Sequence, residues 1–140
     1  MRPLAVLCLP LALLLCACTA SPQTVTVARV IDGDTFVSTS GQHYRLWGVD
    51  APEVGQSWSA EATAALTELT TGQTVSIEPK GQSYDREVVR TTVEGEDISA
   101  ELARRGLAHW EPQFAPRSAG YSEAEAEARA AGRGIWSDKR

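Results

Sequence analysis

Alternating apolar and polar positions predict three strands in the first third of the chain. Residues 24–31 alternate in this way and are rich in β-branched side chains, as expected of a half-buried strand. Residues 32–34, Asp-Gly-Asp, supply a turn, and residues 35–39 return as a second strand. A further turn at 40–42 leads into a third strand at 43–49. These patterns together predict a three-strand meander.

Helical spacing replaces this alternation between Trp58 and Thr70, where the apolar residues fall on one face. Gly72 follows as the expected C-cap. Four shorter elements are predicted after it: strands at 75–77 and 88–93, a helix at 100–105 and a last helix at 122–131. This order indicates an α+β fold that is mainly β, and it is compatible with a five-stranded barrel and three helices.

The first eighteen residues have the layout of a secretory signal peptide. Arg2 precedes an apolar run at 3–15 that is too short for a comfortable membrane span. Leu-Cys-Ala-Cys at 15–18 resembles a bacterial lipobox, in which Cys18 would receive lipid; residues 18–21 also fit an ordinary signal peptidase site. We favour the lipobox. We therefore expect a leader at 1–20 and a single domain at 21–140, exported and either lipid-anchored to the cell envelope or released.

Composition narrows the class of protein further. All three cysteines lie in the leader, so the domain has no disulfide even though an oxidising compartment would permit one. The formal net charge is -5, which argues against a protein that coats nucleic acid non-specifically. Lysines are scarce, so contacts to phosphate would fall to arginine. Nothing in the sequence argues for an oligomer or an obligate protein partner.

Two acidic segments are candidates for a metal site. If the strands at 35–39 and 43–49 pair as a hairpin, Asp34 and Asp50 lie near the same end of the sheet. Converging carboxylates with backbone carbonyls form an all-oxygen site that suits Ca²⁺ or Mg²⁺ and not zinc. Taken alone, Asp-Gly-Asp is more often an ordinary turn. An EF-hand is excluded, because its twelfth position counted from Asp32 is His43 and not Glu.

Two arginines are candidates for phosphate binding. Arg45 lies on the third predicted strand with the same parity as Trp47 and Val49, and Arg86 lies in a predicted loop. Either would ordinarily be a solvated charge. A fixed guanidinium, however, donates two hydrogen bonds to the oxygens of a charged phosphorus centre, which an ammonium group does less well.

Four segments in order resemble the staphylococcal nuclease (thermonuclease) family. They are 30–36 (VIDGDTF), 44–53 (YRLWGVDAPE), 106–108 (GLA) and 134–136 (GIW), and the similarity covers nearly all of the domain. The resemblance implies an OB-fold barrel, which agrees with the predicted order of elements. It also implies a calcium-dependent endonuclease that hydrolyses phosphodiester bonds of DNA and RNA with little sequence preference.

The resemblance further implies roles for individual residues around a calcium ion. Asp34 and Asp50 match the carboxylate ligands. Ala51 matches the position that supplies a backbone carbonyl to the metal. Asp32 matches a nearby acidic residue with a supporting role. Glu53 matches the general base or water-orienting residue.

The catalytic arginines follow from the same resemblance. Arg45 matches the arginine that stabilises the charged transition state. Arg86 is expected to be the second one, because its spacing to Gly95 agrees with the family; Arg90 is the alternative.

The segment around Arg86 departs from the family pattern. The family commonly has Tyr-Gly-Arg, and this chain has Tyr84-Asp85-Arg86, so Asp85 could pair with Arg86 and weaken phosphate binding. Tyr84 would lie near the substrate base, where an aromatic ring stacks without reading sequence.

Two other classes of function compete with the nuclease. The first is a catalytically inactive domain of this fold that binds nucleic acid or protein. The second is a periplasmic calcium-binding or surface-interaction lipoprotein with no catalysis. Retention of both aspartates, Glu53 and both arginines argues against the first alternative. For the nuclease, the partners are a nucleic acid substrate and, only through a lipid anchor, a membrane.

Overall fold

The computed structural model describes residues 22–137. The predicted leader at 1–20, with the lipidation site Cys18, lies outside the described residues. Within them, no helix has the length and apolar character needed to span a membrane.

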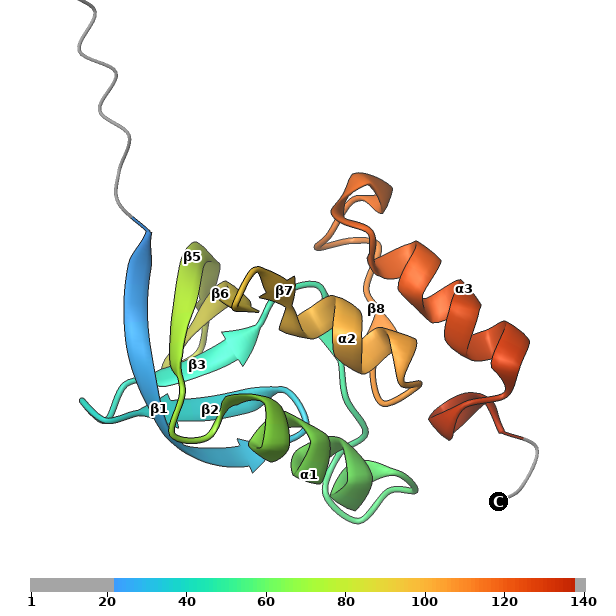
Figure 1. Cartoon of the computed structure of the whole chain (residues 1–140), viewed down its shortest axis with the longest axis horizontal. Coiled ribbons are helices and arrows are strands. Elements are labelled where there is room, and N and C mark those ends of the chain that lie inside the picture. Colours follow the sequence, from blue (N-terminus) through green and yellow to red (C-terminus); the bar gives the residue numbers. More distant parts are fainter. Residues whose placement is uncertain (1–21, 138–140) are drawn as a thin grey trace, which may run out of the picture.

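A five-stranded barrel forms one side of the molecule (Figure 1). Strands β3, β2, β1, β5 and β6 follow one another in the sheet, and a parallel pairing of β3 with β6 closes the ring. The strand bounds are β1 (Gln23–Asp32), β2 (Thr35–Ser38), β3 (His43–Leu46), β4 (Val49–Asp50), β5 (Thr74–Ser83), β6 (Arg86–Val93), β7 (Glu96–Asp97) and β8 (His109–Trp110). The predicted fold class, an α+β barrel with three helices, is therefore confirmed.

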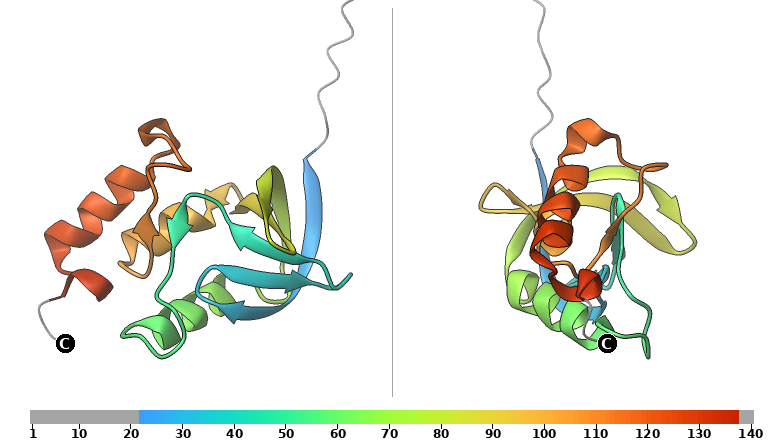
Figure 2. Two further views of the ribbon diagram at one scale, coloured as in Figure 1. Left: turned by 180° about the vertical axis from the view of Figure 1, so that it is seen from behind. Right: turned by 90° about the vertical axis from the view of Figure 1, so that its right-hand side faces the viewer.

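The helices lie beside and beyond the barrel (Figure 2). They are α1 (Ser59–Thr70), α2 (Ile98–Arg104) and α3 (Tyr121–Ala131), with short 3₁₀ turns η1 (Arg117–Ala119) and η2 (Gly134–Trp136). Helix α1 packs on β1, and α2 lies between β6 and α3. Fully buried Phe36, Leu46 and Leu66 contribute to a single core that joins the barrel to the helices. Burying each such side chain stabilises the fold by roughly 1.5–3 kcal/mol.

The third predicted strand is wrong in one respect: it is broken at Gly48. β3 ends at Leu46, and β4 starts at Val49 in a separate two-stranded sheet with β8. Gly48 has φ +74°, and a Cβ there would lie 2.4 Å from the Cβ of Ala115, so only glycine fits without a shift. The break turns the chain so that Asp50 returns toward the barrel instead of continuing along it.

The strand predicted at 75–77 is longer than expected. β5 continues to Ser83, with a bulge between Pro79 and Gly81. The bulge accommodates Pro79, which cannot donate to the ladder. The hairpin between β5 and β6 turns only at Tyr84 and Asp85, because Ser83 pairs with Arg86.

Asp97 connects three elements and provides a test of the fold. One carboxylate oxygen accepts from the amide of Ala100 and caps α2, while the other accepts from Arg90 (2.7 Å) and from the buried hydroxyl of Tyr121 (2.9 Å).

We expect Asp97→Ala to lower the free energy of unfolding by about 3 kcal/mol, from the lost cap and the lost charge-assisted bonds. Urea unfolding measures this. A decrease in the free energy of unfolding of less than about 1 kcal/mol would show that these bonds of Asp97 contribute little to stability.

Candidate active site

Arg45 lies at the centre of the candidate site, and its guanidinium is held from two sides. Nη1 donates to the backbone carbonyls of Leu46 (2.9 Å) and Val49 (3.0 Å). Nη2 donates to Asp50 Oδ1 (3.1 Å) and lies 3.5 Å from Asp34 Oδ2. The break after β3 makes this arrangement possible, because it brings Val49 and Asp50 back to the end of the strand that carries Arg45.

Asp34 is a buried carboxylate at the mouth of the β1–β2 hairpin, with 7% of its surface exposed. Oδ2 accepts from the amide of Ala51 (3.0 Å), and Oδ1 accepts from the hydroxyl of Thr35 (3.0 Å). Burial raises the pKa of Asp34 to about 6, and the neighbouring Asp32 adds to this, while Arg45 and the Ala51 amide oppose it. The site therefore holds a carboxylate whose charge is costly even beside Arg45.

The raised pKa of Asp34 predicts how stability depends on pH in the metal-free protein. The folded state binds the Asp34 proton more tightly than the unfolded state, whose pKa is near 3.8. The stabilisation by protonated Asp34 is therefore present at pH 4 and is lost as the pH rises through about 6. We expect the stability of the parent relative to Asp34→Asn to fall by about 2–3 kcal/mol between pH 4 and pH 7. Urea unfolding of both proteins in chelator measures this, and a constant difference would contradict it.

The Asp-Gly-Asp segment is both an ordinary turn and part of the site. The amide of Asp34 donates to Asp32 Oδ1 (3.1 Å), so Asp32 stabilises the turn that presents Asp34. A Cβ on Gly33 would lie 2.6 Å from the Cβ of Ala51 and 2.7 Å from that of Ala62. The turn therefore packs directly against the segment after β4 and against α1.

Asp34 and Asp50 are the two carboxylates that the sequence predicts as metal ligands. An oxygen of each lies within 3.5 Å of Arg45 Nη2, so the two side chains converge. Hard oxygen donors suit Ca²⁺ or Mg²⁺, and a divalent cation would offset the cost of the buried Asp34 charge. Within residues 22–137, no cluster of three or more His, Cys, Asp or Glu side chains has the geometry of a metal site. The residues present fit a hard cation. Backbone carbonyls and water would complete its coordination.

Arg86, at the start of β6, is held by hydroxyl groups. Nη1 donates to Thr35 Oγ1 and Nη2 donates to Ser83 Oγ, each at 3.2 Å. In the described part of the chain Asp85 forms no ion pair with Arg86, although the two are adjacent. The alternative, Arg90, pairs instead with Asp97 near the start of α2. Arg86 thus joins the site through Thr35, and Arg90 has a structural partner elsewhere.

The structure leaves Glu53 and Tyr84 out of direct contact with the other predicted residues. Glu53 is exposed in the loop between β4 and α1. Its amide donates to Gln56 Oε1 (2.8 Å) and its carbonyl accepts from the Gln56 amide (2.9 Å), which fixes the backbone but not the carboxylate. Tyr84 is 96% exposed at the tip of the β5–β6 hairpin.

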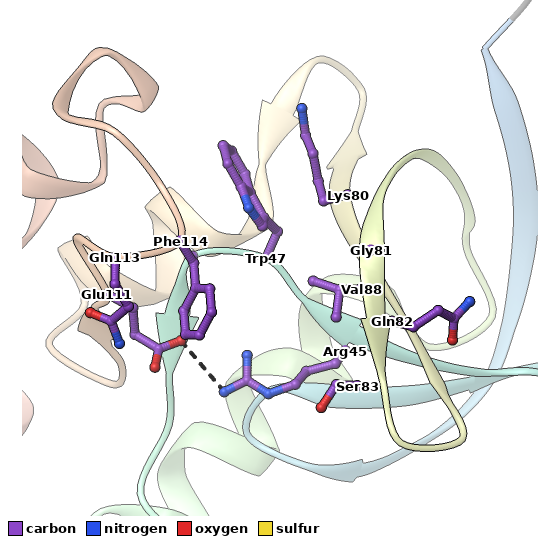
Figure 3. Close-up of a pocket in the computed structure, with 11 residues that line it drawn as sticks. Arg45, Trp47, Lys80, Gly81, Gln82, Ser83, Val88, Glu111, Gln113 and Phe114 are labelled. Carbon is purple, nitrogen blue, oxygen red and sulfur yellow. Dashed lines mark ion pairs between the residues drawn. The ribbon is translucent and has the colours of Figure 1, made fainter.

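A cavity of about 480 Å³ opens beside Arg45 (Figure 3). Its walls combine aromatic, cationic and polar side chains, among them Trp47, Lys80, Gln82, Ser83, Glu111, Gln113 and Phe114. Trp47 has the parity of Arg45 along the strand, so the sequence held a signal for it. No sequence pattern pointed to Phe114, which is 61% exposed. Its segment lies far along the chain and reaches the site because β8 pairs with β4.

Glu111 is the functional candidate that the sequence did not reveal. Its carboxylate lies 3.7 Å from Arg45 Nη2, on the cavity side of the guanidinium (Figure 3). Its backbone amide donates to the carbonyl of Gly48 (2.9 Å), which anchors it. Burial raises the pKa of Glu111, with a further contribution from Asp50, and Arg45 opposes the shift. Arg45 thus has three carboxylates around one nitrogen.

Comparison with known proteins gives the family. A profile described as staphylococcal nuclease homologue matches residues 43–138. The chain is 34% identical over 127 residues to a micrococcal nuclease of Shigella flexneri, covering 80% of this chain and 72% of that protein. It is 30% identical over 134 residues to a thermonuclease of Staphylococcus hyicus (85% and 79% covered). It is also 30% identical over 129 residues to an uncharacterized endonuclease of Haemophilus influenzae (89% and 72% covered).

The chain belongs to the staphylococcal nuclease family. The predicted family is therefore confirmed, and with it the predicted class of enzyme, a phosphodiesterase of the endonuclease type. Nucleases of this family are in general metal-dependent and act on nucleic acid.

Proposed function

We propose that this protein is a calcium-dependent nuclease that cuts DNA and RNA with little sequence preference and acts as a monomer. The observation that carries the proposal is the set of groups around Arg45: a fixed guanidinium, two converging aspartates and an adjoining cavity. The individual roles of the site residues are part of the proposal.

The hydrogen bonds of Arg45 support a role in binding a substrate phosphate. A guanidinium has five N–H donors. Two carbonyls engage Nη1, and Asp50 engages one hydrogen of Nη2. Among the described residues Nε forms no hydrogen bond, whereas Nη2 also lies 3.5 Å from Asp34 Oδ2 and 3.7 Å from Glu111 Oε2. We propose that Nε and Nη2 together contact two phosphate oxygens, with the phosphate competing with these carboxylates for Nη2, a bidentate contact that stabilises charge in the transition state. Arg86, held by Thr35 and Ser83, adds a second cation at the same phosphate.

In this proposal Asp34, Asp50 and the carbonyl of Ala51 hold the calcium ion. When bound, Ca²⁺ would supply positive charge at the scissile phosphate, which helps an attacking water. Glu53 would orient that water and accept its proton. The turn that Gln56 closes fixes the backbone of Glu53, so its side chain has only its own rotamers to search.

The aromatic side chains around the cavity support a substrate with bases. Phe114 is exposed on the cavity wall, and Tyr84 is exposed at the tip of the neighbouring hairpin. Stacking on such rings tolerates every base, because each has a π-face. This agrees with cleavage that has little sequence preference.

The test is cleavage by the purified domain from Ser21 onward. Single-stranded DNA and RNA are incubated in Ca²⁺, in Mg²⁺ and in chelator, and a Glu53→Gln sample controls for contaminating nucleases. We expect cleavage that requires Ca²⁺. Cleavage equally fast in chelator would refute the metal dependence. A folded, calcium-saturated domain that binds nucleic acid without cutting it would instead be a binding module.

We further propose that the protein is exported by the leader at 1–20 and lipid-anchored at Cys18. The lipobox-like Leu-Cys-Ala-Cys at 15–18 supports this. Fractionation of cells that produce the full chain tests it. Nuclease in the membrane fraction that becomes soluble in Cys18→Ser supports the anchor, whereas soluble nuclease from both chains supports release by ordinary signal peptidase.

A further inference from the structure

Thr35 lies between the two charged halves of the site, on β2 directly opposite Arg45 of β3. Only 2% of its surface is exposed, so its hydroxyl depends on partners within the protein. The hydroxyl donates to Asp34 Oδ1 (3.0 Å) and accepts from Arg86 Nη1 (3.2 Å). One side chain therefore connects the carboxylate proposed to bind the metal with the second arginine.

The partners of Thr35 fix the direction of both bonds. A guanidinium only donates and an ionised carboxylate only accepts, whereas a hydroxyl does both. The hydroxyl thus links Arg86 to Asp34 while keeping the two charges apart. Across residues 22–137, Arg86 has no ion pair with a carboxylate. A direct pair would occupy the Asp34 oxygen needed for a cation and a donor of Arg86 needed for phosphate.

We propose that Thr35 is a positioning residue of the nuclease site. Its hydroxyl sets the separation between the Asp34 carboxylate and the Arg86 guanidinium, so that both act on one substrate phosphate. This inference rests on the proposed function and adds a residue that touches neither metal nor substrate. It gives the threonine of the Asp-Gly-Asp-Thr segment a role that the aspartates alone leave unexplained.

A pair of substitutions separates the hydroxyl from the bulk of the side chain. Thr35→Val replaces the hydroxyl by a methyl group, and Thr35→Ser keeps the hydroxyl and removes the methyl group. We expect kcat to fall about ten- to a hundredfold in Thr35→Val, as for the loss of a hydrogen bond to a charged group, and KM to rise at most several-fold. Thr35→Ser should stay within about threefold of the parent in kcat and show a lower melting temperature.

Thr91 supplies a matched control. It is a fully buried threonine on β6, and its hydroxyl has no hydrogen-bond partner among the described residues. Thr91→Val makes the same chemical change outside the site, so kcat should not change. If Thr35→Ser is as slow as Thr35→Val, or if Thr91→Val is equally slow, activity follows packing and the positioning role is wrong.

A double-mutant cycle tests whether Thr35 acts through Arg86. In an Arg86→Gln background, Thr35→Val should lower kcat by less than about twofold further, because the hydroxyl then has no arginine to position. Fully multiplicative losses would show that the two residues act independently and would overturn the inference.

Binding of inorganic phosphate separates this inference from the proposed function. If the parent hydrolyses no diester with any divalent cation, the proposed function fails, and calorimetry with phosphate still reports on Arg86. Binding several-fold weaker in Thr35→Val and unchanged in Thr35→Ser supports the positioning role. Equal binding by the parent and both variants overturns it.

Discussion

Arg45→Lys is expected to lower kcat/KM by a factor of about 10²–10³ and to leave the protein folded, as when one preorganised donor to a transition state is removed. The two hydrogens of Nη1 are engaged by the carbonyls of Leu46 and Val49, and Nη2 reaches Asp50. A guanidinium satisfies these acceptors and keeps Nε, which forms no hydrogen bond among the described residues, beside Nη2 for a phosphate. An ammonium group has three donors on one nitrogen and cannot reach both these protein acceptors and a phosphate.

Steady-state hydrolysis of an oligonucleotide at saturating Ca²⁺ measures this effect, with circular dichroism to establish the fold. Arg29→Lys is the control, because Arg29 is exposed on β1 and the change is chemically identical. A rate for Arg45→Lys near that of the parent would mean that a point charge suffices at this position. The bidentate contact would then have no part in the mechanism.

Glu53→Gln is expected to lower kcat by a factor of about 10²–10⁴, the usual contribution of general base catalysis. The amide has the shape of the carboxylate but does not take a proton from water. Glu53 is exposed, and only its backbone is tied to the loop, so stability should change by less than about 0.5 kcal/mol. Calcium binding by calorimetry should match the parent, because Glu53 is not a proposed ligand.

Glu111 is a second candidate for the general base, besides Glu53. Glu111 contacts Arg45 directly, whereas Glu53 has no side-chain contact with the site among the described residues. Parallel assays of Glu53→Gln, Glu111→Gln and the exposed control Glu94→Gln identify the base. A large loss confined to Glu53→Gln supports the proposed role. A large loss confined to Glu111→Gln would transfer that role to Glu111.

Local sequence patterns predicted the elements of the fold well. The meander, helix α1, the C-terminal helix and the α+β class follow from the alternation of side chains and from helical spacing, which depend on near neighbours. The closed barrel was expected from the family resemblance. The errors lie at strand boundaries that depend on residues far away in the sequence. The strand predicted at 43–49 breaks at Gly48, where φ is +74° and where Ala115 and Tyr121 leave no room for a Cβ. β5 extends through Lys80 because β6 pairs with it across a bulge.

The site, like the fold, was predicted in part from local sequence and depends in part on long-range contacts. Hairpin geometry predicted that Asp34 and Asp50 approach one another, and the structure brings both to Arg45. Asp32 was expected to have a supporting role, and it accepts the hydrogen bond that holds the Asp34 turn. Glu111 and Phe114 gave no signal, since they belong to the segment after β8 and reach the cavity only because β8 pairs with β4.

The sequence by itself determined the family, the order of the five barrel strands and the three helices, and the acidic and arginine side chains of the candidate site. Residue type and local spacing carry that information. Only the tertiary structure decided which donors of Arg45 remain for phosphate, how deeply Asp34 is buried, and that Thr35 joins Asp34 to Arg86. These properties depend on distances between segments up to 51 residues apart in the chain, which packing sets and local pattern does not encode.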